Sequence, residues 1–143
     1  MGKLDGKITI VTGATSGIGR RTVELFVKEG ARVVATGRRG ELGKTLEEAM
    51  GKDKCLFVTA DATQEADVKR MFEACLSRWG RVDCLFNNAG GPAPVGGIET
   101  VPVEGFDAAM ATLVRSVMLG MKHAAPLMMK QGSGSIINNG SVA

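Results

Sequence analysis

The sequence predicts an α/β fold built on one doubly wound parallel sheet. Short apolar runs alternate along the chain with longer stretches of helical periodicity. Polar clusters rich in glycine or asparagine follow the apolar runs, at the points where strands would end. Glycine is abundant, with 20 residues among 143, and it separates apolar runs instead of forming a low-complexity tail. Such alternation implies parallel strands joined by right-handed helical crossovers.

Each element can be placed from its pattern. The expected strands are Ile8–Val11, Arg32–Thr36, Cys55–Thr59, Val82–Asn87 and Ser135–Asn138. The expected helices are Gly17–Lys28, Gly40–Met50, Gln64–Trp79 and a longer one within Val103–Lys130. Residues 90–97, rich in glycine and proline, predict a loop, which leaves open a lid on the ligand side of the sheet or a domain linker. At this length we expect one domain, residues 1–143.

Composition narrows the class of protein. The formal charge of +3 is spread along the chain without a block of lysine and arginine, which argues against a nucleic-acid partner. No apolar stretch approaches the ~20 residues of a membrane helix, and the N-terminus lacks the apolar run of a signal peptide. Cys55, Cys75 and Cys84 have no paired or metal-like spacing, so we expect reduced thiols and no metal. A cytoplasmic enzyme or binding domain is expected.

A glycine-rich segment, Thr12–Gly19, connects the first expected strand to the first helix. Free N–H groups and the positive end of the helix dipole favour a phosphate at such a turn. Gly13, Gly17 and Gly19 are spaced G-x-x-x-G-x-G, which differs from the common G-x-G-x-x-G pattern. The spacing alone leaves open a tight turn without a ligand. Its place after the first strand favours a nucleotide site.

Together with this segment, three other motifs carry a family resemblance. They are Asp61, Asn87-Asn88-Ala89-Gly90 and Gly134-Ser135-Ile136-Ile137-Asn138-x-x-Ser141. In their order and spacing the chain resembles the short-chain dehydrogenase/reductase family, over essentially all of its length but only the N-terminal part of the family's usual length. The resemblance implies a Rossmann-like, nicotinamide-dependent oxidoreductase that transfers a hydride to or from an alcohol or ketone. It also implies a homodimer or homotetramer.

The resemblance assigns roles to particular residues. The diphosphate turn would be formed by Gly13, Ser16, Gly17, Ile18 and Gly19. Asp61 would bind the adenine amino group with Ala62 packed beside it, while Asn88, Ala89 and Gly90 would run past the adenosine ribose. Ser141 matches the catalytic serine, which hydrogen-bonds the substrate oxygen. The residues alone leave two alternatives open, a helix cap for Asp61 and a polar turn for Asn87-Asn88.

The end of the second strand bears on the choice of cofactor. An acidic residue there would bind the ribose 2′-OH of NAD, whereas a nearby arginine accommodates a 2′-phosphate. Gly37 stands at the acidic position, and Arg38 follows it. Because a guanidinium can bind a phosphate through two hydrogen bonds, we expect NADP(H) to be favoured, with NAD(H) possible. Arg39 is expected to be solvated.

Some features of the family pattern are missing. The family's general acid/base is a tyrosine, followed by a lysine, both beyond the serine, and this chain has no tyrosine. General acid–base catalysis typically contributes ~10²–10⁴-fold, so the chain alone is expected to be inactive. Leu113 stands where many members carry an asparagine, and His123 is expected to be a packed or partly exposed side chain.

We therefore expect part of a longer enzyme or a truncated product, with a sheet incomplete on its C-terminal side. The last strand and the long helix would then lack cover and invite association. Five methionines are expected in the core or at a helix interface: Met110, Met118, Met121, Met128 and Met129. The alternative is a non-catalytic dinucleotide-binding module or an inactive fragment.

Overall fold

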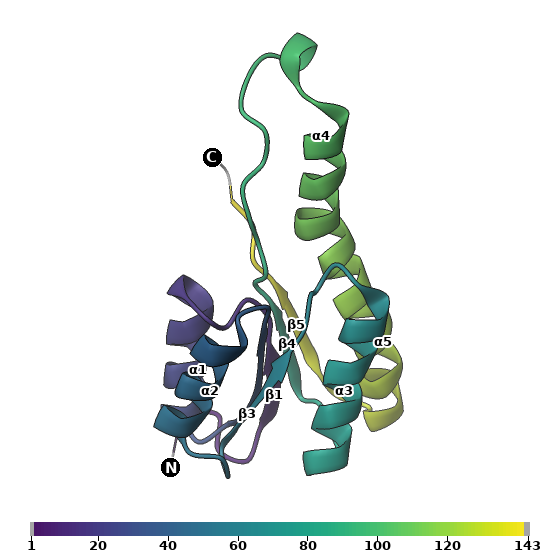
Figure 1. Cartoon of the computed structure of the whole chain (residues 1–143). Helices are drawn as coiled ribbons and strands as arrows, with labels where there is room; N and C mark the ends of the chain where they lie inside the picture. Colours follow the sequence, from purple (N-terminus) through teal and green to yellow (C-terminus); the bar gives the residue numbers. More distant parts are fainter. Residues whose placement is uncertain (1, 142–143) are drawn as a thin grey trace.

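A computed structural model describes residues 2–141 as a Rossmann-like, doubly wound α/β fold (Figure 1). The parallel strands are β1 (Ile8–Val11), β2 (Arg32–Gly37), β3 (Cys55–Thr59), β4 (Cys84–Asn87) and β5 (Ser135–Asn138). Their order in the sheet is β3-β2-β1-β4-β5. After β3 the chain returns to the centre and pairs β4 with β1, so the winding direction reverses between these two strands. Ligands of open α/β sheets bind at such a switch point, beyond the carboxyl ends of the strands.

Helices cover both faces of the sheet. On one face lie α1 (Gly17–Lys28) and α2 (Gly40–Met50), and on the other lie α3 (Glu65–Trp79) and α5 (Ser116–Gln131) (Figure 1). The predicted long helix is continuous but not uniform. It consists of α4 (Val103–Met110), the π-helical segment η2 (Ala111–Arg115) and α5, and its α4 end extends past the sheet. A short 3₁₀ turn, η1 (Ile98–Thr100), precedes it.

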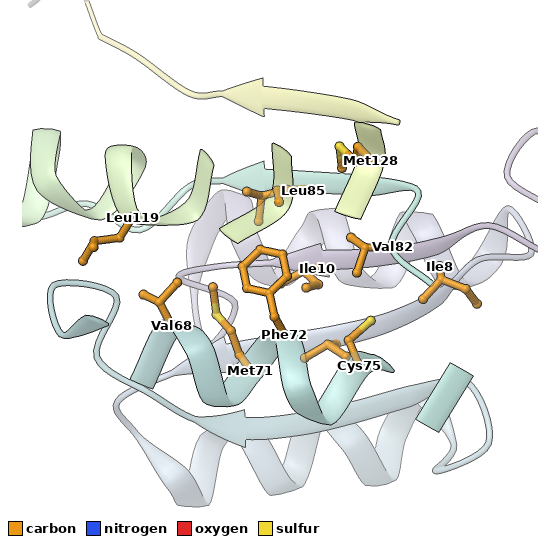
Figure 2. Packing of buried hydrophobic residues seen from close by; sticks show 12 residues of the cluster. Ile8, Ile10, Val68, Met71, Phe72, Cys75, Val82, Leu85, Leu119 and Met128 are labelled. Atoms are coloured by element: carbon orange, nitrogen blue, oxygen red, sulfur yellow. The ribbon is translucent and has the colours of Figure 1, made fainter. Parts of the chain in front are cut away.

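The core has one layer on each side of the sheet. Side chains alternate between the faces of a strand, and in β1 Ile10 belongs to the α3–α5 layer while Val11 belongs to the α1–α2 layer. Figure 2 shows the α3–α5 layer, in which Met71 and Phe72 of α3 approach Leu85 of β4. Burial on both faces explains the near-continuous apolar strands of the sequence.

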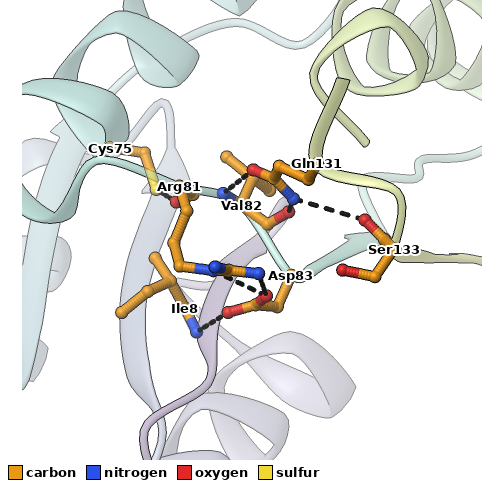
Figure 3. A network of polar contacts seen from close by, with 7 residues as sticks. All are labelled: Ile8, Cys75, Arg81, Val82, Asp83, Gln131 and Ser133. Atoms are coloured by element: carbon orange, nitrogen blue, oxygen red, sulfur yellow. Dashed lines mark hydrogen bonds and ion pairs between the residues drawn. The ribbon is translucent and has the colours of Figure 1, made fainter. Parts of the chain in front are cut away.

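Most predicted boundaries agree with the structure to within a residue. The main exception is β4, predicted from Val82 but starting at Cys84. The side chain of Gln131 binds both backbone groups of Val82: Oε1 accepts its N–H at 3.1 Å and Nε2 donates to its carbonyl at 2.8 Å (Figure 3). Val82 is buried, but its backbone is paired with a side chain instead of a neighbouring strand.

The Asp83 carboxylate, just before β4, binds the amino end of β1 and forms an ion pair with Arg81, opposite the carboxyl edge of the sheet. Asp83 accepts the N–H of Ile8 through Oδ2 at 2.9 Å and the guanidinium of Arg81 through Oδ1 at 2.7 Å (Figure 3). Burial acts to raise the pKa of Asp83, but these hydrogen bonds outweigh it and hold the pKa below the ordinary value. The carboxylate therefore stabilises the folded state while it is charged.

Of the five methionines predicted for the core or a helix interface, one lies in the core. Met128 is in the core, whereas Met110, Met118, Met121 and Met129 are exposed on the long helix. The long helix buries only one stripe against the sheet and α3, so apolar residues on its other faces remain accessible. Their place at a helix interface stays a prediction. Within residues 2–141, no helix combines the length and apolar character needed to cross a membrane.

Candidate functional site

A cleft of about 800 Å³ opens at the carboxyl ends of the strands, at the switch point. The segments that follow β1, β2, β3 and β4 line it, together with one side of the α4–η2–α5 helix. Its walls include Gly13, Ser16, Gly17, Ile18, Arg38, Asp61, Ala62, Asn88, Ala89 and Gly90. Ten of the eleven residues predicted to bind a cofactor thus face one cavity, although they come from four separate turns.

The glycine-rich turn has the form of an anion site. Gly17 begins α1 with φ +54°, and nothing lies within 4 Å of the position that its Cβ would occupy. Ser16 is the N-cap but makes no side-chain capping bond, so the first N–H groups of α1 remain for a ligand. Ile18, 63% exposed, adds an apolar surface at the same edge.

The other two glycines serve the packing of the turn. Gly13 has φ +62°, and its Cβ would lie 2.9 Å from Cα of Ala89. A Cβ on Gly19 would lie 2.0 Å from the carbonyl oxygen of Gly13. Gly19 is buried and, unlike the other predicted residues of this turn, does not line the cleft, so its place at the diphosphate stays a prediction. The lack of a side chain at Gly19 lets α1 pack closely against the glycine-rich turn that precedes the helix.

Arg39 is exposed, as expected, but its guanidinium also makes two hydrogen bonds that were not expected. Its Nη2 donates to Oγ1 of Thr15 at 2.8 Å and to Oγ of Ser16 at 2.9 Å, across the mouth of the cleft. Both Arg38 and Arg39 line the cavity where β2 ends. Sequence reasoning missed this contact because it joins two turns that are far apart in the chain. The cleft therefore has two guanidinium groups at the end of β2, where only that of Arg38 was predicted.

Asp61 closes a local turn and also lines the cleft. Its Oδ1 accepts the N–H of Thr63 at 2.9 Å and the Thr63 hydroxyl at 2.7 Å. This is close to the capping alternative, but α3 takes Gln64 as its N-cap residue. The second oxygen of Asp61, Oδ2, takes no part in the turn. The carboxylate is thus held rigidly at the cavity wall.

Thr12 and Asn88 fasten the glycine-rich turn to the turn after β4. Thr12 Oγ1 accepts the N–H groups of Asn88 and Ala89 at 3.0 and 2.9 Å. In return, Asn88 Nδ2 donates to the carbonyls of Thr12 and Gly13, both at 3.3 Å. Asn88 is therefore more than part of a polar turn, because it holds two walls of the cleft together.

Comparisons with known proteins agree with this geometry. The family described as short chain dehydrogenase matches residues 7–143. The chain belongs to the short-chain dehydrogenase family. It is 41% identical to short-chain dehydrogenase reductase 3a of Arabidopsis thaliana, covering 99% of this chain and 55% of that protein. It is also 41% identical to momilactone A synthase of Oryza sativa subsp. japonica, covering 99% and 52%.

Two solved structures resemble the chain, both with a TM-score of 0.88. A closed serine dehydrogenase complexed with NADP⁺ matches at TM-score 0.88 and 30% identity, over 94% of this chain and 54% of that one. A 3-ketoacyl-(acyl-carrier-protein) reductase from Brucella melitensis, complexed with NADH, matches at TM-score 0.88 and 36% identity, over 95% and 57%. The chain spans about half the length of the curated relatives it matches.

Ser141 lies just beyond β5, on the same edge of the sheet as the cleft, and is exposed. The cavity walls include its neighbour Asn139 but not Ser141 itself. Asn139, missed as a site residue, could have been found from its place directly after a predicted strand. Leu113 is 43% exposed on η2 and lies outside the walls of the cleft.

His123 agrees with the packed, partly exposed side chain that was predicted. Its Nε2 lies 3.1 Å from Oε1 of Glu65, and its ring lies 6.1 Å from that of Phe72. Lys122 contacts the same carboxylate at 2.5 Å, and these two partners hold the pKa of Glu65 below its ordinary value. The imidazole thus joins α5 to α3 and lies away from the cleft.

Proposed function

We propose that the chain forms the cofactor-binding part of an oxidoreductase that transfers a hydride between NADP(H) and an alcohol or ketone. The proposal rests on one observation: a place for a diphosphate and two arginines lie in the same cleft. The open N-terminus of α1 at Gly17 can take a diphosphate, and the two arginines at the end of β2 can take a further phosphate.

The donors in the cleft fit a dinucleotide along its length. The N–H groups after Ser16 would bind the diphosphate, and Gly17 leaves space for it because no Cβ intrudes. Asp61 Oδ2 would accept a hydrogen bond from the adenine amino group, with Ala62 against the ring. Ala89 and Gly90 would follow the adenosine ribose. The bound nicotinamide would supply or accept the hydride.

The preference for NADP(H) rests on this chain's own residues, because similar structures include complexes with both NADP⁺ and NADH. Gly37 offers no carboxylate to a ribose 2′-OH, so the usual contact for NAD is missing at that position. Arg38 and Arg39 place two positive charges at the same end of the cleft. A 2′-phosphate would neutralise part of this charge, which NAD cannot do.

Ser141 is proposed to donate a hydrogen bond to the substrate oxygen. The chain contains no tyrosine, so a proton relay of the family's type would need residues that follow Ser141 in a longer protein. For the chain as given we propose cofactor binding without turnover. The substrate, the cytoplasmic location and the homodimeric or homotetrameric state stay predictions.

Calorimetric titration of the purified chain with NADPH and NADH tests the proposal. NADPH is expected to bind at least about tenfold more tightly, in line with one charge-assisted hydrogen bond, and Arg38→Asp should remove the difference. Equal affinities for the two would overturn the NADP(H) preference. Binding of neither would overturn the cofactor site itself.

A non-catalytic dinucleotide-binding module is the second candidate, favoured by the lack of tyrosine. It predicts NADPH binding with no carbonyl reduction by the longest natural product of the reading frame. Sequencing the transcript past codon 143 separates the two. A Tyr-x-x-x-Lys motif downstream, together with loss of turnover in Ser141→Ala, supports the oxidoreductase; turnover unchanged by Ser141→Ala removes the serine from the mechanism.

A further inference from the structure

Two asparagine pairs join the carboxyl ends of β4 and β5. Asn87 and Asn138 are opposite each other in the register, and Asn87 Nδ2 donates to Asn138 Oδ1 at 2.9 Å. One residue further along each chain segment, Asn139 Nδ2 donates to Asn88 Oδ1 at 3.0 Å. The pairs thus lie next to each other, just where the strands end and the cleft begins.

The two pairs have different surroundings. Asn87 is buried against α5, since a Cβ on Gly120 would lie 2.4 Å from its Oδ1. Asn88 and Asn139 instead line the cleft. The first pair therefore belongs to the sheet–helix interface, and only the second pair is placed to affect a ligand.

The direction of the second pair is determined by the backbone. Asn88 Nδ2 donates to two carbonyl oxygens, those of Thr12 and Gly13. A carbonyl can only accept, so the amide nitrogen of Asn88 must face the glycine-rich turn and its oxygen must face Asn139. Asn139 must then act as the donor, and the hydrogen bonds form one chain from β5 to the turn.

We propose that Asn139 is a positioning residue for the cofactor. Through Asn88 it holds the carbonyls of Thr12 and Gly13, and so the shape of the glycine-rich turn. It also stands two residues before Ser141, so it links the cofactor turn to the segment proposed to meet the substrate. The inference rests on the proposed function, because it explains how that same site is held in shape.

A purely structural role for this side chain is less consistent with its surroundings. Asn139 is exposed, and its backbone N–H donates to the carbonyl of Asn87 at 3.1 Å. Any residue other than proline would keep that backbone bond. Truncating the side chain should therefore alter the turn it holds while leaving the sheet intact.

A double-mutant cycle tests the inference, with NADPH affinity measured by fluorescence on the chain as given. Asn139→Ala is expected to weaken NADPH binding roughly 3- to 10-fold, the range of one neutral hydrogen bond. The melting temperature should change little. In the Asn88→Ala background the same substitution should have almost no further effect, because Asn139 acts through Asn88.

Asn139→Asp and Asn138→Asp form a matched pair with the same change of charge at adjacent positions. Asn139→Asp loses the amide N–H that donates to Asn88, so two oxygens would face each other. Asn138→Asp keeps the oxygen that accepts from Asn87. We expect a loss of NADPH affinity for Asn139→Asp that exceeds that of Asn138→Asp at least about threefold, again the range of one hydrogen bond.

Each other outcome is decisive. Wild-type affinity in Asn139→Ala, or losses that simply add in the double variant, would overturn the inference and leave the proposed function standing. A melting temperature that falls along with the affinity would make Asn139 merely structural. Failure of the wild-type chain to bind NADPH would overturn the proposed function, and this inference with it.

Discussion

Arg39 donates a hydrogen bond to Oγ of Ser16 at 2.9 Å and thereby joins the turn after β2 to the N-cap of α1. Thr15 Oγ1 accepts from the same nitrogen at 2.8 Å. The two hydroxyls orient a guanidinium that would otherwise be free in solvent, so less side-chain entropy remains to be lost when an anion binds. Arg38 has no such support among the hydrogen bonds of residues 2–141.

Arg39→Leu is therefore expected to weaken NADPH binding by roughly 10- to 100-fold, from the loss of a charge-assisted hydrogen bond of about 1.5–3 kcal/mol. NADH, which has no 2′-phosphate, should lose less than about threefold, an estimate that allows for residual effects on the turn. Calorimetric titrations of both cofactors check the result. An equal loss for NADPH and NADH would show that Arg39 supports the turn instead of reading the phosphate.

The close packing of the glycine-rich turn gives a second prediction. Gly19→Ala would place a methyl group 2.0 Å from the carbonyl of Gly13, so the turn or α1 must shift. Overpacking of this kind costs about 1–3 kcal/mol, and dinucleotide binding should fall along with the melting temperature. Gly140→Ala, whose Cβ would have nothing within 4 Å, is the control and should melt like the wild type. A wild-type melting temperature for Gly19→Ala would contradict the packing argument.

The sequence was sufficient to predict the elements that depend on local pattern. Apolar runs such as Ile8–Val11 are buried on both faces in a parallel sheet, so they stand out from the amphipathic helices between them. All strands of a parallel sheet point the same way, so the turns that follow them could be placed at one edge. The cleft could thus be anticipated because parallel topology gathers strand ends together.

What the sequence could not predict depends on contacts between distant residues. The start of β4 is set by the side chain of Gln131, and the role of Arg39 is set by Ser16. The direction of the Asn139 bond follows only once Asn88 is seen to face two carbonyls. The composition of Ala111–Arg115 did not predict a π-helical segment there, because neither glycine nor proline lies within it.

The carboxylate of Asp83 makes stability depend on pH. Its pKa is below the ordinary value in the folded state, so its contribution is fully present above the unfolded pKa, about 3.9, and is lost as pH falls through the folded value. Asp83→Asn should cost about 1–2 kcal/mol at pH 7, because hydrogen bonds to a charged group are weakened. The gap from wild type should narrow as the pH falls toward 3.

Urea unfolding at a series of pH values measures this effect. Asp53→Asn, at an exposed position in the turn before β3, is the matched control and should run parallel to wild type. A gap between Asp83→Asn and wild type that stayed constant from pH 7 to pH 3 would mean that the charge of Asp83 contributes nothing. The packing of an isosteric amide would then account for the whole difference.

Thiol reactivity tests the burial of the two core layers. Burial raises the pKa of Cys55 and of Cys75 to about 12 each, and it also raises the pKa of Cys84. Only the thiolate attacks a disulfide reagent, so at pH 8 the folded chain should label slowly. Cys84 should react first because it is the least buried of the three.

In denaturant all three thiols should react at the rate of a model peptide, and mass spectrometry of peptides assigns each site. Cys84→Ala isolates the two core thiols, which belong to opposite faces of the sheet: Cys55 to the α1–α2 layer and Cys75 to the α3–α5 layer. If the layers open in one cooperative transition, Cys55 and Cys75 should label at the same rate. Faster labelling of Cys75 would mean that the layer containing the long helix opens by itself, before the sheet and the cofactor turn are lost.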